Sequence, residues 1–321
     1  MTNMQMSDRI GRRMKLHDLH VLMTVAQAGS MSRAAQLLNT TQPAISKSIA
    51  DLEHAIGARL LDRGRQGAEP TQYGRALLDG GVAVFDDLRQ AVKNIEFLAN
   101  PTVGEVKIMA TDPIIVGVVP AVLDRLRRKH PGISVHVTPI VTDAQRARDL
   151  RERRFDLYFG RITPPIEEDI DLEILFHDSL KIVAGAKSRW ARRRKMDLSE
   201  LANESWVLPR RDSNIGQDLA RAFHACGAEF PPKGAVWGAA SLMCAYLPWG
   251  TSLGILAASL LRFGANIPRL KVLPLNLPVD PWPVGIMTLK NRTLTPVVKL
   301  FIEYARAVTK PLAGKQETQR S

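Results

Sequence analysis

The first third of the chain places hydrophobic residues at the three-and-four spacing of amphipathic helices. The pattern predicts a helix from about Leu16, a second short helix after a break at residues 29–30, and a third after a turn at residues 39–40. Thr41 is suited to cap the third helix, and Pro43 fits its first turn. The hydrophobic stripe of this third helix consists of Ile45, Ile49, Leu52 and Ile56.

Two short helices joined by a tight turn are typical of a helix-turn-helix, whose second helix enters the major groove of DNA with its N-terminal end. Here that end is polar, so it is suited to base edges and phosphates. An ordinary helical bundle with solvated polar faces fits the spacing about as well. The next loop carries Arg59, Arg63 and Arg65, where a β-wing would meet the DNA backbone, and this favours the DNA interpretation.

A long helix is predicted from Thr71 to Ala99, ending at Asn100-Pro101. Gly80 and Gly81 interrupt it, each at a cost of roughly 1 kcal/mol relative to alanine. Its hydrophobic residues follow the spacing of a coiled-coil seam, which favours pairing with a second copy over packing on the chain's own core. The seam comprises Leu78, Phe85, Leu88, Val92, Ile95 and Ala99.

Strand-like and helical segments alternate from Thr102 onward, which predicts an α/β part with a mainly parallel sheet. More than two hundred residues in this part predict two lobes. The polar tail from Pro311 is expected to be disordered. The expected strands are Gly104–Thr111, Ser134–Val141, Asp156–Gly160, Ile174–Phe176, Leu180–Ala184, Trp206–Leu208, Leu253–Ala258, Leu270–Leu273 and Val284–Leu289.

The net charge of the chain indicates a polyanionic partner. The 321 residues include 44 Lys and Arg against 32 Asp and Glu, a formal net charge of +12, which suits nucleic acid or an anionic membrane surface. A membrane span is rejected for the uncharged stretch Gly234–Leu261, because Pro248, Trp249 and Gly250 interrupt it. The residues after Arg12-Arg13 are charged, so an export signal is rejected too, and a cytoplasmic protein is expected.

The segment from Leu16 to Leu78 resembles the N-terminal winged helix-turn-helix of LysR-type transcriptional regulators. The resemblance rests on spacing and residue type over some sixty positions. The matching residues are Ala34-Ala35, Gln42-Pro43-Ala44, Ser46, Leu52-Glu53, Gly57 and Leu60-Leu61, followed by Thr71 and Gly74 at the start of the linker helix.

The resemblance implies an all-α N-terminal part followed by a two-lobed α/β domain like that of periplasmic binding proteins. The expected divisions are a winged helix-turn-helix at 1–70, a dimerising linker helix at 71–100 and an effector-binding domain at 101–315. Within that domain, lobe I is expected at about 102–162 plus 290–312, and lobe II at about 163–289. The implied partners are double-stranded DNA with an inverted repeat, a small effector, and the chain itself as a homodimer or homotetramer.

The family's DNA-contacting positions fall on the turn before the third helix, on its first residues and on the wing. Lys47 stands where members often have Arg, and lysine lacks the bidentate fork that reads guanine. The expected DNA-contacting residues are Ser32, Thr41, Gln42, Pro43, Ser46, Lys47, Arg63 and Arg65. The N-terminal extension with Arg9, Arg12, Arg13 and Lys15 is interpreted as a disordered leader.

An effector is expected where strands end, because ligands of open α/β sheets bind beyond the carboxyl ends of the strands. Thr111 and Asp112 follow the first strand, Thr142 a later one, and Arg161 follows Asp156–Gly160. Ser241 is a candidate from the other lobe. Arg161 suits an anionic effector, whereas Asp112 suits a hydroxylated one or serves as a helix cap.

Enzyme chemistry is not indicated, and neither a cofactor nor a metal is expected. Gly250 to Gly254 matches the G-x-S-x-G pattern of hydrolases, but a helix precedes it and a strand follows, the reverse of a nucleophile elbow. His17 and His20 lie three residues apart in a predicted helix, and a surface face is favoured over a metal site. Cys226 and Cys244 have no flanking basic residue that would activate a thiolate for a redox switch. The effector, the target genes and the direction of regulation are not specified by the sequence.

Overall fold

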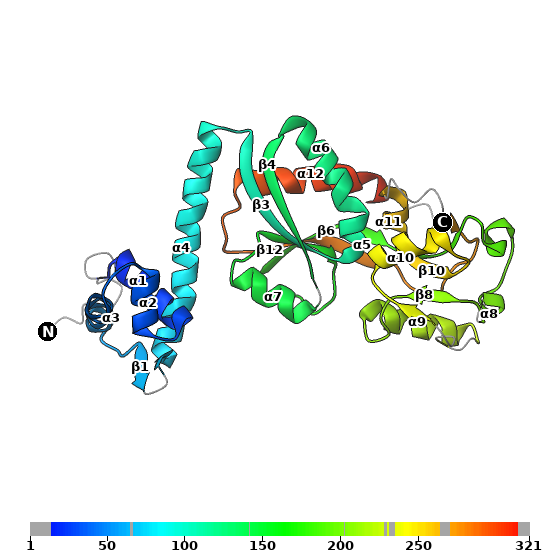
Figure 1. Cartoon of the computed structure of the whole chain (residues 1–321). Coiled ribbons are helices and arrows are strands. Elements are labelled where there is room, and N and C mark those ends of the chain that lie inside the picture. Colours follow the sequence, from blue (N-terminus) through cyan, green and yellow to red (C-terminus); the bar gives the residue numbers. More distant parts are fainter. Residues whose placement is uncertain are drawn as a thin grey trace. The chain divides into compact units, whose positions relative to one another are not determined.

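The computed structural model describes residues 14–64, 67–140, 142–201, 203–227, 230, 235–263 and 270–313 (Figure 1). The chain forms two compact units, Met1–Ala91 and Val92–Ser321. The candidates Arg9, Arg12, Arg13 and Arg65 lie outside the described residues, as does the tail after Ala313. The tail was expected to be disordered from Pro311, but Pro311 to Ala313 are the last residues of a helix, Pro296–Ala313.

The first unit contains three short helices and a β-hairpin. The helices are α1 (Leu16–Ala28), α2 (Met31–Leu37) and α3 (Gln42–Ile56), and the hairpin pairs β1 (Leu61–Gly64) with β2 (Gly67–Pro70). The core of this unit includes Leu22, Val25, Ile45, Ile49 and Leu52, all almost fully buried. The predicted stripe of α3 is therefore the face that packs on α1 and α2.

Local capping explains where these helices begin and end. Gly29 ends α1 in a left-handed conformation, with φ of 68°. The Ser30 side chain accepts a hydrogen bond from the Arg33 backbone N–H at the start of α2. The Thr41 side chain accepts one from the Ala44 N–H, which confirms it as the cap of α3.

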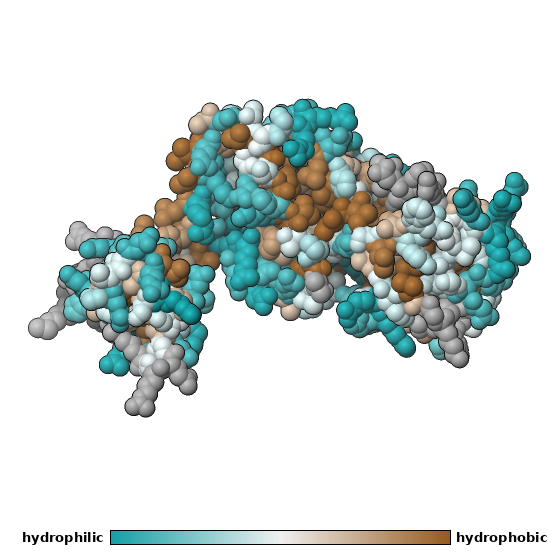
Figure 2. Space-filling model, viewed as in Figure 1, coloured by the Kyte–Doolittle hydropathy of each residue, from teal (hydrophilic) through white to brown (hydrophobic). Residues whose placement is uncertain are grey.

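The long helix α4 (Gln72–Ala99) divides its hydrophobic seam between two environments. Near its start, Leu78 packs on the first unit's core and the Phe85 ring lies 5.6 Å from the His20 ring. Farther along, Leu88, Val92 and Ile95 are 44%, 54% and 66% exposed. Figure 2 shows hydrophobic residues along the outside of this helix. The predicted seam therefore begins as part of the chain's own core and continues as an unpaired stripe.

The first sheet of the second unit has the strand order β4-β3-β5-β12-β6. β3 is parallel to both β4 and β5, whereas β12 is antiparallel to both β5 and β6. The strands are β3 (Val103–Ala110), β4 (Gly132–Pro139), β5 (Leu157–Arg161), β6 (Ile170–Asp178) and β12 (Trp282–Leu289). The helices beside this sheet are α5 (Asp112–Val116), α6 (Val118–Lys129), α7 (Asp143–Arg151) and α12 (Pro296–Ala313).

The second sheet has the order β11-β7-β10-β8-β9 and forms the other lobe. β10 is antiparallel to β7 and parallel to β8. The strands are β7 (Leu180–Gly185), β8 (Trp206–Leu208), β9 (Val236–Trp237), β10 (Leu253–Ala257) and β11 (Leu270–Val272). The helical elements are η2 (Arg189–Arg192), α8 (Leu198–Leu201), α9 (Asn214–Ala225), α10 (Ala240–Tyr246), η3 (Leu247–Trp249) and α11 (Ala258–Phe263).

Two expectations about this unit need correction. The sheets are mixed rather than mainly parallel, because β12 and β7 run against their neighbours. In addition, β6 and β12 belong to the first sheet, so the strands do not divide between lobes at residues 162/163 and 289/290. The chain instead passes from the first sheet to the second between Asp178 and Leu180, and returns in the segment before Trp282. Periodicity could not show this, because a strand's own pattern does not identify its neighbour.

The uncharged stretch near residue 250 folds into short elements. Its described part, residues 235–261, contains β9, α10, η3, β10 and the start of α11. Within the described chain, no helix has the length and apolar character needed to cross a membrane.

Candidate nucleic-acid interface and ligand cavity

The leading turn of α3 presents polar groups on the surface of the first unit. Thr41, Gln42 and Pro43 are all exposed. The Ser32 hydroxyl, on α2, donates a hydrogen bond of 2.8 Å to Oε1 of Gln42. This bond uses one of the two lone pairs of the amide oxygen, so the other lone pair and the NH₂ group of Gln42 remain available to a base. Ser32 therefore fixes the orientation of the Gln42 side chain.

Two further members of the expected set differ in accessibility. Lys47 is exposed on α3. Ser46 is only partly accessible, and its hydroxyl lies 3.4 Å from Sδ of Met31 on α2. The Ser46 side chain therefore contributes to the contact between the two helices.

The hairpin β1–β2 is the wing that the sequence predicted. Its second strand is tied to the end of α1, because the Ala68 N–H donates to the Gly29 carbonyl at 3.0 Å. A side chain at Gly67 would place its Cβ 2.3 Å from the same oxygen, so this close approach requires glycine. Arg63 lies on β1, and its side chain is outside the described set.

A cavity of about 370 Å³ lies in the second unit where residues of both lobes meet. It brings together three of the expected effector residues, Thr111, Thr142 and Arg161. A volume in this range accommodates a small organic molecule. The wall also includes residues that were not expected, namely Tyr158, Thr163, Asp178, Asp212, Ser213, Asn214 and Trp282.

Asp112 and Ser241 do not line this cavity. The Ser241 backbone N–H donates to Oδ2 of Asp112 at 2.8 Å, so the carboxylate caps the first turn of α10. Asp112 is the first residue of α5 in the first lobe, and Ser241 lies in the second. Asp112 therefore caps α10, 129 residues away in sequence, and not the helix that directly follows it, as was expected. The pair joins the lobes beside the cavity.

Arg161 is the cationic side chain in the cavity wall. Its Nη2 donates to Oδ2 of Asp218 on α9 at 2.8 Å, and its guanidinium lies 4.9 Å from the centre of the Trp282 ring. Asp218 also accepts from Nη2 of Arg221 at 2.5 Å, so two cations share one carboxylate. Nη1 of Arg161 is buried and has no hydrogen-bond partner among the described residues. Nη1 of Arg161 can therefore donate a hydrogen bond to an anionic ligand in the cavity.

Two helix N-termini border the same cavity. Thr142 caps α7 by accepting from the Gln145 N–H at 3.1 Å, and Ser213 caps α9 by accepting from the Gly216 N–H at 3.1 Å. The N-terminal end of a helix carries partial positive charge, which attracts anions. Asp143 opposes this attraction, but its own carboxylate pairs with Arg146 at 2.8 Å.

Buried polar groups complete the wall. Burial raises the pKa of Asp178, whose carboxylate accepts from the backbone and hydroxyl of Ser259. Burial also raises the pKa of Tyr158, whose hydroxyl donates to the Arg161 carbonyl at 2.7 Å. Gly160 leaves room for this arrangement, since a Cβ there would lie 2.5 Å from the Tyr158 oxygen and 2.7 Å from Thr111 Cγ2.

The described residues that could suggest catalysis are not arranged as a catalytic serine, a metal site or an activated thiol would require. Ser252 of the G-x-S-x-G match lies between η3 and β10, with its hydroxyl 3.1 Å from that of Ser205. The described residues contain no group of three or more potential metal ligands. Burial, with a smaller contribution from Asp112, raises the pKa of Cys244 to about 11, so this thiol is not activated.

Comparison with known proteins identifies this arrangement. Residues 16–75 match the family described as "Bacterial regulatory helix-turn-helix protein, lysR family", and residues 99–310 match "LysR substrate binding domain". The second match alone covers well over half of the chain. The chain belongs to the LysR family of transcriptional regulators. The sequence-based resemblance is thereby confirmed, and with it the helix-turn-helix and effector-domain architecture.

Curated relatives are described as HTH-type transcriptional regulators. The uncharacterized regulator YdcI of Escherichia coli is 31% identical over 181 residues, covering 56% of this chain and 59% of YdcI. This chain thus aligns with less than two thirds of YdcI. GbpR of Azospirillum brasilense is 25% identical over 300 residues, covering 92% of this chain and 87% of GbpR.

Solved structures of full-length regulators share the fold. CbnR in complex with its target DNA has a TM-score of 0.59 at 21% identity, covering 92% of this chain and 100% of CbnR. A full-length OxyR variant from Pseudomonas aeruginosa has a TM-score of 0.63 at 20% identity, covering 94% of this chain and 99% of that protein.

The sequence did not predict several of the residues that form the cavity of this LysR-type chain. Tyr158 lies within the expected strand Asp156–Gly160 and was not predicted as a site residue, although its hydroxyl reaches the end of the same strand. Trp282 carries no local pattern that distinguishes it, and neither does Asp218, the partner of Arg161. The one usable signal was Ser213, a good N-cap residue before an amphipathic segment, which marks a helix N-terminus and hence an anion-attracting point.

Proposed function

We propose that this LysR-type regulator reads DNA with the leading turn of α3. The observation that supports this most strongly is the exposed Gln42 amide held by Ser32 at 2.8 Å. A glutamine amide fits the donor and acceptor pair of adenine in the major groove. Thr41, Pro43 and Lys47 would position the turn, and Arg63 and Arg65 would contact phosphates. Ser46 is assigned a smaller part, because its hydroxyl contacts Met31.

A substitution at Gln42 tests this proposal. Gln42→Ala is expected to cost about 1–3 kcal/mol on the cognate promoter site and little on random DNA. Gel shifts with upstream DNA from the regulator's own locus provide the cognate substrate. Equal losses on both DNAs would show that Gln42 only positions the complex.

We propose that the exposed stripe of α4 pairs two copies of the chain. Leu88, Val92 and Ile95 leave one side of the helix hydrophobic for several turns, as a paired helix requires. A dimer would read an inverted repeat, and assembly of dimers into tetramers would use the α/β domains. Ile95→Glu is expected to shift the protein toward monomer in analytical ultracentrifugation. An unchanged oligomer would remove α4 from the dimer contact.

We propose that the cavity binds a small anionic effector, with Arg161 as its main charge. The supporting observation is the unpartnered, buried Nη1 of Arg161, together with the two helix N-termini at the cavity wall. Thr111 and Thr142 would add hydrogen bonds. Asp112 and Ser241 are assigned to joining the lobes, because they bond to each other.

A thermal-shift screen of small metabolites against the full chain identifies candidate effectors. Calorimetry on Arg161→Ala then tests the assignment, since loss of the guanidinium should weaken an anionic ligand by about tenfold or more. Unchanged affinity would remove Arg161 from the site. Effector binding would act by favouring one lobe angle over another, in a cytoplasmic protein that has access to DNA.

A further inference from the structure

The basic charge of this chain is concentrated outside the helix-turn-helix. Residues 179–281 contain 14 Lys and Arg against seven Asp and Glu, whereas residues 1–70 contain nine against six. The densest run is Lys187 to Lys195, in which six of nine residues are basic and none is acidic. We call these six residues, Lys187, Arg189, Arg192, Arg193, Arg194 and Lys195, the basic end.

Two residues of the basic end are fixed by their neighbours. The Trp190 side chain is buried, and the guanidiniums of Arg189 and Arg193 lie 5.0 Å and 5.3 Å from the centre of its ring. Arg189 pairs with Glu204, and Arg193 pairs with Glu200 at 2.6 Å. These contacts hold the η2 turn in place and neutralise two of its six charges.

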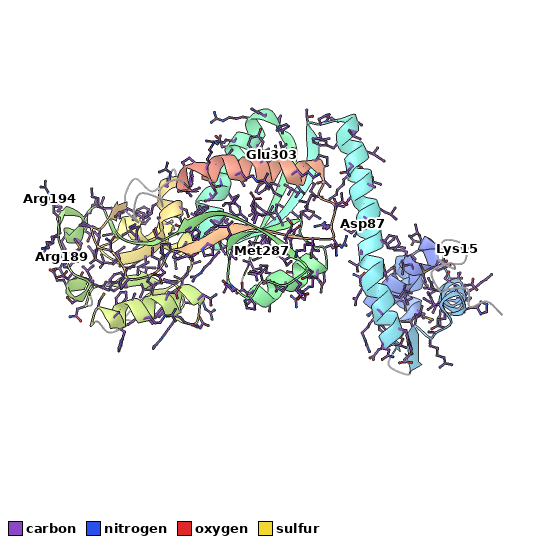
Figure 3. All side chains as sticks on the ribbon, turned by 180° about the vertical axis from the view of Figure 1, so that it is seen from behind. Lys15, Asp87, Arg189, Arg194, Met287 and Glu303 are labelled. Atoms are coloured by element: carbon purple, nitrogen blue, oxygen red, sulfur yellow. The ribbon has the colours of Figure 1, made fainter. Side chains whose placement is uncertain are left out.

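The other four residues keep their charges exposed. Lys187, Arg192, Arg194 and Lys195 have no carboxylate partner within the described chain. Figure 3 places Arg189 and Arg194 at the end of the second lobe that lies away from the first, and Figure 2 shows hydrophilic surface there. Unpaired cations gathered on one surface repel each other, so the cluster is disfavoured unless a polyanion compensates it.

The surface chemistry favours nucleic acid over a protein partner. Protein interfaces depend on a desolvated hydrophobic or aromatic centre. The one aromatic residue of the basic end, Trp190, is 6% exposed, and residues 187–201 present no exposed large hydrophobic side chain. Exposed guanidinium and ammonium groups without such a centre match a phosphate backbone, which requires charge and no apolar contact.

We propose that the basic end is a second, sequence-independent DNA contact on the effector domain. It binds the phosphates of duplex DNA outside the bases read by α3, and so adds affinity without specificity. The proposal rests on the proposed DNA binding of the chain. DNA is the polyanion that the chain already engages, so the second contact involves the same molecule.

Salt dependence of binding tests the proposal on the full chain. Each phosphate contact contributes about 0.9 to the slope of log affinity against log salt. The triple variant Arg192→Gln, Arg194→Gln, Lys195→Gln is expected to reduce the slope by about 2–3 and to weaken random duplex DNA by about tenfold or more at about 0.1 M salt. Fluorescence anisotropy on a duplex that extends well beyond the promoter half-sites measures both.

A matched control separates a local contact from general charge. Arg125→Gln, Arg127→Gln, Lys129→Gln removes the same charge from the exposed face of α6. This control is expected to change the slope by less than about 0.5. A basic-end variant whose slope equals wild type or the control overturns the proposal. If that variant keeps its slope but loses transcriptional output in cells, the surface binds an acidic protein instead, and the DNA proposal is equally overturned.

Failure of the second DNA contact can be distinguished from failure of the proposed DNA binding. If wild-type protein ignores DNA at low salt, DNA binding itself is wrong. If wild type binds, and Gln42→Ala loses cognate preference while the basic-end variant keeps its slope, only the second contact is wrong.

Discussion

Arg161 on β5 and Asp218 on α9 form a 2.8 Å ion pair that joins the two lobes at the cavity. The two side chains are 22% and 17% exposed, so solvent screens the pair only partly. The carboxylate occupies the guanidinium nitrogen Nη2 and leaves Nη1 without a partner among the described residues. An anionic effector would therefore bind an Arg161 guanidinium whose charge is already partly neutralised by Asp218.

Removing the Asp218 charge should tighten binding of an anionic effector. Asp218→Asn frees Arg161 from a competing carboxylate, and the expected gain is about 3- to 10-fold in affinity. Calorimetry with a carboxylate found by the thermal-shift screen measures it. Asp212→Asn is the matched control, because Asp212 lines the cavity and pairs with Arg210 at 2.5 Å in its own lobe rather than with Arg161. Equal changes in both variants would mean that general charge, not the Arg161 pair, controls affinity.

Ser32 should affect DNA binding through Gln42. Ser32→Ala removes the hydroxyl that donates to Oε1 of Gln42, and a loss of about 0.5–1.5 kcal/mol is expected on cognate DNA only. The measurement is a double-mutant cycle in gel shifts, with Ser32→Ala made in wild type and in Gln42→Ala. The serine substitution should add almost nothing in the Gln42→Ala background. Additive losses would show that Ser32 contacts DNA independently.

The two adjacent glycines of α4 should respond differently to alanine. A Cβ at Gly80 meets nothing within 4 Å, so Gly80→Ala should stabilise the protein by about 0.5–1 kcal/mol. A Cβ at Gly81 would lie 3.2 Å from Leu19 Cδ1 and 3.3 Å from Met23 Sδ, where α1 packs on α4. Gly81→Ala should therefore gain less or destabilise. Denaturant unfolding compares them, and an equal gain would contradict the packing at Gly81.

The two cysteines should differ in reactivity. Burial raises the pKa of Cys244 to about 11, whereas Cys226 is exposed after α9. At pH 8 only about one Cys244 thiol in a thousand is ionised, so iodoacetamide should label Cys226 first. The rate at Cys244 should rise with pH up to about 11. Mass spectrometry of wild type and Cys226→Ser follows each site, and rapid labelling of Cys244 at pH 8 would refute the burial argument.

The features that sequence predicted are those encoded locally. The stripe of α3, the Thr41 cap and most strands depend on residues a few positions apart, and all are present. Thr111, Thr142 and Arg161 came together because carboxyl ends of neighbouring strands share an edge. The DNA contacts remain a prediction.

The features that sequence missed depend on distant partners. Asp112 bonds to Ser241, and Arg161 pairs with a carboxylate 57 residues away; no pattern near either residue indicates this. The assignment of β6 and β12 to lobe II failed for the same reason, because their partners lie across a chain crossing. The α4 seam was predicted as one surface, but tertiary packing covers only its first part.

The two chain crossings between the sheets limit how this domain can respond to a ligand. One crossing lies between Asp178 and Leu180 and the other in the segment before Trp282, so each lobe is tethered to the other twice. Sliding would stretch both tethers together, whereas rotation about a line through them requires only small changes in backbone dihedral angles. We therefore expect a ligand in the cavity to change the angle between the lobes rather than to slide one lobe along the other.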